Sequence, residues 1–432
     1  MNQKKKVVLA SQIIDGTGGK PLEESAVLIE GSTIVKIGKK SEILQIVEHQ
    51  EYDLLDYTGF VLIPGMVDCH THHNGFGDGR LGDEVAEIPD EILTIKSSSN
   101  ARIALFSGVT TIRENGPKNM TMFRLRDAIK SGIEIGPRMN LCGRPVSIIG
   151  GHMGYFGGEV TGEFEVTRFV RSLIKEGADY IKITQTGGTT KTSFPLLPAF
   201  NMDELLAITN EAKKFGKLTA THCVSTEGTI NSLDSGVDMI IHSVFKEPDG
   251  TDKFRPDVAE RLAESEAFVN PTLHVFRARA WEMEKLALKR PLSKDEIKLF
   301  DEHRRNFDQR LLDCSKMMEM GVKVITGSDS SWGDYKLGNT IHETECVNMA
   351  GYSVSQSFNS VTLGAAKALG MDDIVGSLES GKKADMVVIK GNPLQEIGNL
   401  RNIHEVIFDG NIIDRGSKDS NKVYIQSPPS IN

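Results

Sequence analysis

The chain has 432 residues and a formal net charge of −9, with 39% hydrophobic and 25% charged residues. This length suits one large domain with a smaller one, and an acidic balance without a basic stripe argues against a nucleic-acid partner. No apolar stretch reaches the roughly 18 residues of a membrane span, and the run at 7–10 is too short for a signal sequence. We therefore expect a cytoplasmic protein without a membrane partner. Five scattered cysteines without a CxxC pair indicate neither a disulfide framework nor a thiolate zinc site.

Short β-type runs occur at both ends of the chain. Residues 26–37 are typical of a hairpin around Glu30-Gly31, and residues 406–413 repeat this pattern around Asp409-Gly410. Residues 384–390 form another buried-type run just before the second hairpin. Two unrelated hairpins are the alternative, but the shared pattern favours one small sheet domain built from both termini.

The middle of the chain alternates β-type runs with helical patterns. One of the clearest helices is predicted over 201–215, where Asn201 can cap the start, Glu204 follows three residues later and Gly216 ends the helix. Eight β-then-α units predict a closed parallel barrel, and a doubly wound open sheet is the alternative, although no GxGxxG motif supports it. The eight runs are Met66–Thr71, Val109–Arg113, Arg138–Cys142, Tyr180–Ile183, Lys217–His222, Met239–His242, Phe268–Thr272 and Lys323–Thr326.

Histidines and an aspartate gather at the predicted carboxyl ends of these strands, where barrel enzymes carry their chemistry. His70 and His72 are two residues apart on one strand, so they point the same way. Neutral imidazoles aimed at one point are a natural metal site. His222 and His242 end two later strands, and Asp329 follows the last one. We therefore predict a metal site at this end of the barrel.

Lys182 lies inside an apolar strand, Tyr180–Ile183, where a bare ammonium is costly unless it is paired. One interpretation is a buried lysine paired with a carboxylate. The other is a lysine carboxylated by carbon dioxide, which would bridge two metal ions. Its position between the first two histidines and the later ones favours the second interpretation.

The chain resembles the metal-dependent amidohydrolase superfamily over nearly its full length. The resemblance implies a (β/α)8 barrel over 63–370 and a small β-sandwich domain made from 1–62 and 371–432. The segments that carry it are Pro64–His72, Tyr180–Ile183, Ala220–His222, Ile241–His242, Gly327–Asp329 and Gly376–Asp385.

The resemblance implies two divalent metal ions, usually Zn²⁺. His70, His72 and Asp329 would hold the more buried ion. His222 and His242 would hold the other, with carboxylated Lys182 and a hydroxide as bridges. The hydroxide would attack an amide carbonyl of a peptide or N-acyl amino acid, and Asp329 would take its proton and pass it to the leaving group.

Members of the superfamily that lack the lysine often use one metal and tend to be deaminases. Lys182 therefore favours amide hydrolysis, with a mononuclear imidazolonepropionase-like hydrolase of cyclic amides, or a deaminase, as the alternative. A scaffold without activity is a third hypothesis, but the complete ligand set argues against it.

Within the superfamily the chain is most similar to prolidase-type dipeptidases and ochratoxin-amidase-like enzymes. The supporting segments are Gly150-Gly151-His152, Thr186-Gly187-Gly188 and Asn270–Leu273. This similarity implies that His152 is a catalytic residue that binds the substrate carbonyl or carboxylate, with an incidental histidine in a glycine-rich loop as the alternative.

The chain also departs from these relatives. They usually carry a second histidine and a glycine after the ligand of strand 5, where this chain has Cys223-Val224-Ser225. They tend to have Glu-His where it has Ile241-His242, and Thr-Asp where it has Ser328-Asp329. The metal ligands are intact, but the small-molecule substrate stays open.

Further substrate contacts are expected near the predicted strand ends. The loop 73–90, with four glycines, could close over the site, and the long helical stretch 276–310 could cover it or meet a second subunit. A homo-oligomer is therefore expected, with a plain surface helix as the alternative. The expected contacts are Arg113, Tyr155 and His274, with Arg144 and Trp332 as weaker candidates.

Overall fold

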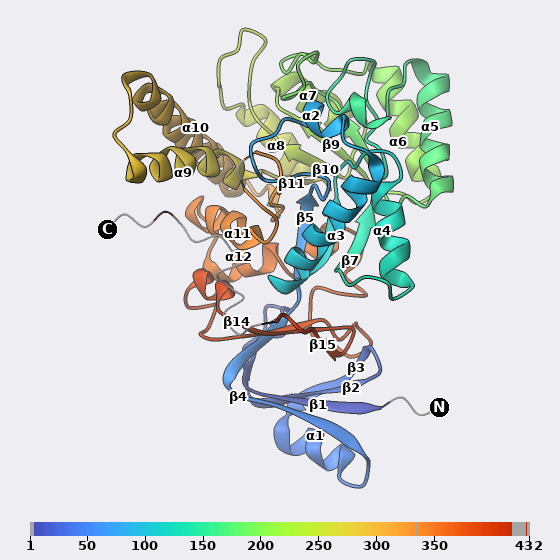
Figure 1. The fold of residues 1–432 in the computed structure, drawn as a ribbon, viewed down its shortest axis with the longest axis vertical. Coiled ribbons are helices and arrows are strands. Elements are labelled where there is room, and N and C mark those ends of the chain that lie inside the picture. The colour runs from blue at the N-terminus through green and yellow to red at the C-terminus, as the bar shows by residue number, and fades with distance from the viewer. Residues whose placement is uncertain (1–3, 334, 417–428, 430–432) are drawn as a thin grey trace.

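The computed structural model describes residues 4–333, 335–416 and 429. Figure 1 shows a sheet made from both ends of the chain and, beside it, a larger part in which helices surround parallel strands. The predicted segment 371–432 lies outside the described residues from 417 onward, except for residue 429.

Strands from both termini pair in one seven-stranded sheet. β4 and β13 join the two ends in antiparallel pairing, with Ile63 opposite Val387. Both predicted hairpins are confirmed, because β2 pairs with β3 and β14 pairs with β15. The domain boundaries themselves stay a prediction. In sheet order the strands are β15 (Asn411–Ile412), β14 (Ile403–Phe408), β13 (Met386–Ile389), β4 (Tyr52–Pro64), β1 (Lys5–Ile13), β2 (Leu22–Glu30) and β3 (Thr33–Lys39).

Eight parallel strands form the larger part, as predicted. They fall into two sheets rather than one continuous ring: β5 (Met66–Thr71), β6 (Val109–Glu114) and β7 (Arg138–Leu141) in one, and β8 (Ile181–Thr184), β9 (Thr219–Cys223), β10 (Met239–His242), β11 (Phe268–Asn270) and β12 (Lys323–Val324) in the other. Single bridges join the two sheets at their two seams, from Val146 to Ile183 and from Thr71 to Ser330.

The predicted helix after β8 is confirmed as α6 (Met202–Lys214), with the expected reciprocal cap between Asn201 and Glu204. The region predicted as one helical stretch over 276–310 is wrong in detail. It is a hairpin of α9 (Leu273–Lys289) and α10 (Lys294–Glu319), because Pro291 interrupts the helix and Ser293 caps a new one. This hairpin projects from the body (Figure 1).

Most of the remaining helices pack around the parallel strands, whereas α1 (Lys40–Val47) packs on β2 and β3 of the terminal sheet (Figure 1). In α5, for example, Val166, Phe169, Val170 and Leu173 are buried in the core. Among the described residues, none of the helices combines the length and apolar character needed to cross a bilayer. The others are α1 (Lys40–Val47), α2 (Gly82–Ala86), α3 (Asp90–Phe106), α4 (Thr121–Lys130), α5 (Gly162–Glu176), α7 (Thr226–Asp234), α8 (Pro256–Glu264), α11 (Thr340–Met349), α12 (Val354–Ser360) and α13 (Leu363–Ala368).

Candidate active site

The end of β5 and the loop after β12 bring together His70, His72 and Asp329, which we call the first ligand group. The Nε2 atoms of the two histidines lie 3.1 Å apart. Asp329 Oδ1 lies 3.3 Å from His70 Nε2 and 3.1 Å from His72 Nε2. Three buried ligand atoms within 4.8 Å of one another are an arrangement that could hold a metal ion.

The hydrogen bond of His70 Nδ1, the ring nitrogen away from Asp329, shows whether Nε2 carries a proton. Asn270 Nδ2 donates to the carbonyl oxygen of Gly327 at 3.0 Å, so its Oδ1 accepts a proton from His70 Nδ1, also at 3.0 Å. His70 Nε2 therefore presents a lone pair to the carboxylate oxygen of Asp329. Two acceptors this close repel each other unless a cation lies between them, so the donor set fits a metal ion.

His222 at the end of β9 and His242 at the end of β10 form the second ligand group. His222 Nε2 donates to the carbonyl oxygen of Gly187 at 3.0 Å, which leaves a lone pair on Nδ1. This Nδ1 lies 3.0 Å from His242 Nε2, and His242 Nδ1 lies 2.7 Å from Thr272 Oγ1. The rings of His70 and His242 are 5.8 Å apart, so the two groups face each other.

Lys182 in β8 is buried, with 1% of its surface exposed. Its Nζ lies 3.5 Å from Asn115 Oδ1, a long and weak hydrogen bond. Asp329, the carboxylate that most raises the pKa of Lys182, pairs with the histidines instead. Burial is the larger effect and lowers the pKa of Lys182 to about 7, so a large share of this amine is neutral near pH 7.

Burial lowers the pKa of the site histidines, and neighbouring positive charges add to the shift. The pKa falls to about 4 for His242 and to about 3 for His152, and it falls well below its ordinary value for His70 and His222. These rings are therefore neutral at pH 7, which is the form that binds metals. Burial alone would raise the pKa of Asp329, but the hydrogen bond from His72 and the electrostatic effects of His72, His242 and Lys182 outweigh it and lower that pKa.

His152 follows β7 and lies against the second ligand group. Its ring centroid is 4.4 Å from that of His222, and its Nδ1 is 2.9 Å from Thr190 Oγ1. Gly188 passes so close that a Cβ there would lie 2.7 Å from His152 Cε1, which explains why this position has no side chain. The structure thus places His152 beside the predicted metal ligands, and its catalytic role stays a prediction.

The other predicted substrate contacts lie in different surroundings. Arg113 is inside the strands, donating to the carbonyl oxygen of Cys69 at 2.9 Å and stacking on Tyr180. Tyr155 packs on Phe156, and a Cβ at Gly82 would lie 1.8 Å from its hydroxyl. Burial of Arg113 does not favour a contact with substrate. For both residues that role stays a prediction.

His274, Trp332 and Arg144 were the remaining candidates. His274 is buried in α9 among the rings of Trp281, Tyr335 and His342. The ring of Trp332 lies 5.3 Å from that of His72, so it borders the first ligand group. Arg144 turns away from the site and pairs with Glu176 of α5.

Several residues that support the ligands had no assigned role in the sequence. Asn270, Thr272 and Thr190 hold His70, His242 and His152 by hydrogen bonds. The segment Asn270–Leu273 stood out by its resemblance to relatives, but the partner of each side chain is set by contacts across the fold. Such pairs carry no local pattern in the sequence.

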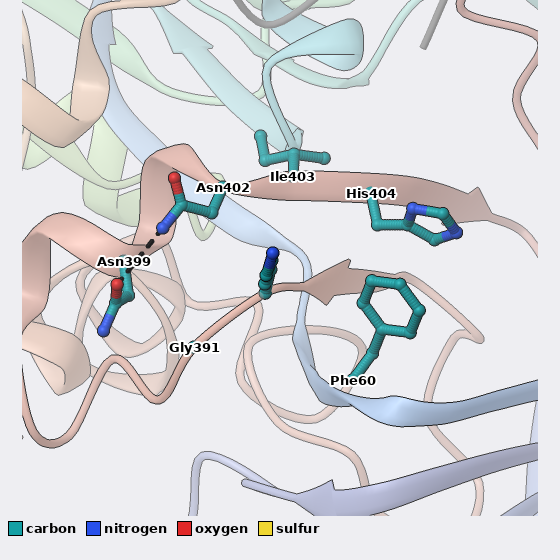
Figure 2. A pocket seen from close by; sticks show the side chains of 7 residues that line it. Phe60, Gly391, Asn399, Asn402, Ile403 and His404 are labelled. Carbon is teal, nitrogen blue, oxygen red and sulfur yellow. Dashed lines mark hydrogen bonds between the residues drawn. The ribbon is translucent and has the colours of Figure 1, made fainter.

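A surface pocket of about 600 Å³ lies on the terminal sheet, away from the ligand groups. Figure 2 shows Phe60 and His404 side by side on its wall, with ring centroids 4.1 Å apart. Lys390, Gly391, Asn399, Asn402 and Ile403 complete the lining. None of the predicted ligands lines this pocket, so it is distinct from the candidate active site.

The model of the amidohydrolase family matches residues 61–413 of this chain. The chain belongs to the amidohydrolase family. The resemblance carried by the histidine, lysine and aspartate motifs is therefore confirmed, and with it the expectation of a hydrolase that acts on carbon–nitrogen bonds.

Named relatives of this amidohydrolase cover most of its length. Ochratoxinase from Aspergillus niger is 24% identical over 425 residues, which span 90% of this chain and 82% of the relative. Imidazolonepropionase from Fusobacterium nucleatum is 23% identical over 393 residues, 84% of each chain. Among solved structures, a Xaa-Pro dipeptidase with bound methionine in the active site matches with a TM-score of 0.80 at 28% identity, over 95% of this chain and 100% of that one.

Proposed function

We propose that this amidohydrolase is a binuclear metal-dependent enzyme that cleaves the amide bond of a peptide or N-acyl amino acid. The first and second ligand groups would each hold one divalent ion, with Zn²⁺ the expected metal because imidazole and carboxylate ligands suit it. Ions bound there would lower the pKa of a water molecule and polarise the scissile carbonyl. We further propose that the two parallel sheets act as one (β/α)8 barrel that presents both groups at one end.

The observation that carries this proposal is the position of Lys182. Among the described residues its buried amine has no close carboxylate partner and lies beside Asn115, and its lowered pKa leaves a nucleophilic neutral form. Attack of this amine on carbon dioxide, with loss of one proton, gives an anionic carbamate. That group would supply the bridge that a pair of ions needs, whereas a single ion does not need it.

Asp329 and His152 would handle the proton and the substrate. Asp329 uses Oδ1 toward the histidines of the first ligand group, and its lowered pKa keeps it ready to accept a proton. A Thr190 hydroxyl that donates to Nδ1 of His152 would leave the ring proton on Nε2. From there it can donate to a carbonyl oxygen on which charge develops.

The mouth of the site supports an apolar substrate group. Phe194 is 71% exposed on the loop after β8, and Ile149 is 69% exposed on the loop after β7. The two loops are tied together, because Thr192 Oγ1 donates to the carbonyl oxygen of Gly150 at 2.8 Å. Exposed apolar side chains beside a catalytic cleft are typical of a binding surface, so we propose an apolar or aromatic group on the substrate.

The second candidate is a mononuclear imidazolonepropionase-like hydrolase of cyclic amides, or a deaminase. The similarity to imidazolonepropionase over 84% of the chain favours keeping it. The homo-oligomer and the cytoplasmic location stay predictions.

Substitution of Lys182 separates the two candidates. Lys182→Ala should lose most of the activity toward N-acyl amino acids and dipeptides and retain less than two metal ions per chain. A short carboxylate added to the solution should restore part of the activity. A Lys182→Ala enzyme with full activity and unchanged metal content would contradict the bridge.

A further inference from the structure

We propose that helix α11 braces both ligand groups at once, and that Glu343 is a positioning residue that acts on His242 through Thr272. This inference rests on the proposed metal pair and adds residues that touch neither metal nor substrate. α11 follows the last parallel strand and lies beside α9 (Figure 1). Its first turn carries two buried side chains, Thr340 and Glu343, which serve different ligand groups.

Thr340 supports the first ligand group through Asp68. Its Oγ1 donates to Asp68 Oδ2 at 2.5 Å. The other oxygen of Asp68 accepts the backbone N–H of His70 at 3.0 Å and that of Ser328 at 2.9 Å. The buried carboxylate of Asp68 therefore fixes the backbone at His70 and at the residue before Asp329, so that these two ligands of the first group lie together.

Glu343 holds the beginning of α9 in the same way. Its side chain has no exposed surface, and its Oε1 and Oε2 accept the backbone N–H groups of Leu273 and His274 at 2.9 and 2.6 Å. These are the first two N–H groups of α9, which have no acceptor within the helix. Glu343 thus fixes the chain directly after Thr272.

Thr272 needs that support because its backbone is strained. It adopts the left-handed conformation, with φ of 50°, which a β-branched residue rarely adopts. Opposite it, His242 and Ser243 are also left-handed, with φ of 68° and 48°. Two strained segments face each other here, so contacts from outside must hold them in register.

The contact between these segments sets the state of a metal ligand. Thr272 Oγ1 lies 2.7 Å from His242 Nδ1, and His242 Nε2 points at His222 Nδ1. A partner on one ring nitrogen orients the ring and leaves the other nitrogen for the metal. Glu343, which lies 70 residues from Leu273 in the sequence, therefore acts on the second ligand group through α9 and Thr272.

Three variants and one control test this brace. Glu343→Gln keeps one acceptor oxygen but places an NH₂ group against the other N–H. Thr272→Val removes the hydroxyl that meets His242, and Thr272→Ser keeps it. Thr344→Val is the control, because Thr344 is equally buried in the same helix and its hydroxyl bonds to Thr340 O within that helix.

The measurement is metal content and metal affinity for each variant, by elemental analysis and titration with zinc against a chelator. Thermal unfolding follows stability in parallel. Glu343→Gln and Thr272→Val should bind one ion as the wild type does and the second about 10- to 100-fold more weakly. Thr272→Ser and Thr344→Val should bind both ions as the wild type does. The melting temperatures of the variants should not follow the same order as their affinities for the second ion.

Wild-type affinity for both ions in folded Glu343→Gln would overturn the inference. If Glu343→Gln does not fold, Thr272→Val decides, and wild-type affinity for both ions in that variant would overturn it. A wild-type chain that binds only one ion would instead overturn the proposed function, so the two failures are distinguishable.

Discussion

Replacing Asp329 by Asn tests the chemistry of the site with the smallest change in shape. Asp329 places Oδ1 within 3.3 Å of the Nε2 atoms of His70 and His72, and Asn can keep that oxygen in place. The second oxygen becomes an NH₂ group, which cannot accept a proton. A general acid–base group contributes about 10²- to 10⁴-fold to kcat, which corresponds to about 3–5 kcal/mol of activation free energy. We predict a fall in kcat of that size.

The assay compares kcat and metal content of Asp329→Asn and wild type on one N-acyl amino acid that the wild type hydrolyses. The variant should retain most of its metal, because all four histidine ligands and one oxygen of residue 329 remain. A near-normal kcat at full metal content would refute the assignment of Asp329 as proton carrier. His152 would then be the next candidate.

Three other predictions concern substrate binding and pH. His152→Ala should keep its metal content while kcat falls about 100-fold, the cost of losing one donor to a developing oxyanion, and metal loss measured by elemental analysis would instead make His152 a ligand. Phe194→Ser should lower kcat/KM for substrates with a large apolar group about 10-fold, whereas Ile133→Ser, at a residue that is also strongly exposed but lies in the loop before β7, should not. Equal effects of the two substitutions would refute an apolar binding surface at Phe194. Burial would raise the pKa of Glu345, but its bonds to His342 and Arg401 outweigh burial and lower that pKa to about 2. This carboxylate therefore stabilises the fold above its unfolded pKa near 4.5, and the stability is lost as pH falls toward 2. In urea unfolding at pH 7, Glu345→Gln should have a free energy of unfolding about 1–3 kcal/mol lower than that of the wild type. Between pH 5 and pH 3 the variant should lose less stability than the wild type does, and a pH profile equal to that of the wild type would refute this.

The sequence predicted those parts of the fold that have local patterns. β5 and the shared direction of His70, in the strand, and His72, directly after it, follow from the alternation of side chains on a strand, and α6 follows from the capping pair Asn201 and Glu204. The break between α9 and α10 also had a local signal, since Ser293 precedes Glu296 by three residues after a proline. The long charged stretch masked that signal.

The supports of the site could not be predicted because they depend on distant partners and on backbone conformation. Glu343 bonds to N–H groups 70 residues earlier, and the left-handed conformation of Thr272 has no signature in a β-branched residue. Arg113 was placed near a strand end correctly. Its side chain points inward and donates to the carbonyl oxygen of Cys69. Side-chain alternation on a strand does not show whether an inward side chain is buried or faces an open cleft.

The number of metal ions in the fully active wild-type enzyme tests the central claim most directly. Elemental analysis should be combined with activity toward N-acyl amino acids at increasing metal-to-chain ratios. We predict that activity rises until two ions are bound per chain and that chelation abolishes it. Full activity with one ion, or with none, would contradict a binuclear centre built on His70, His72, Lys182, His222, His242 and Asp329.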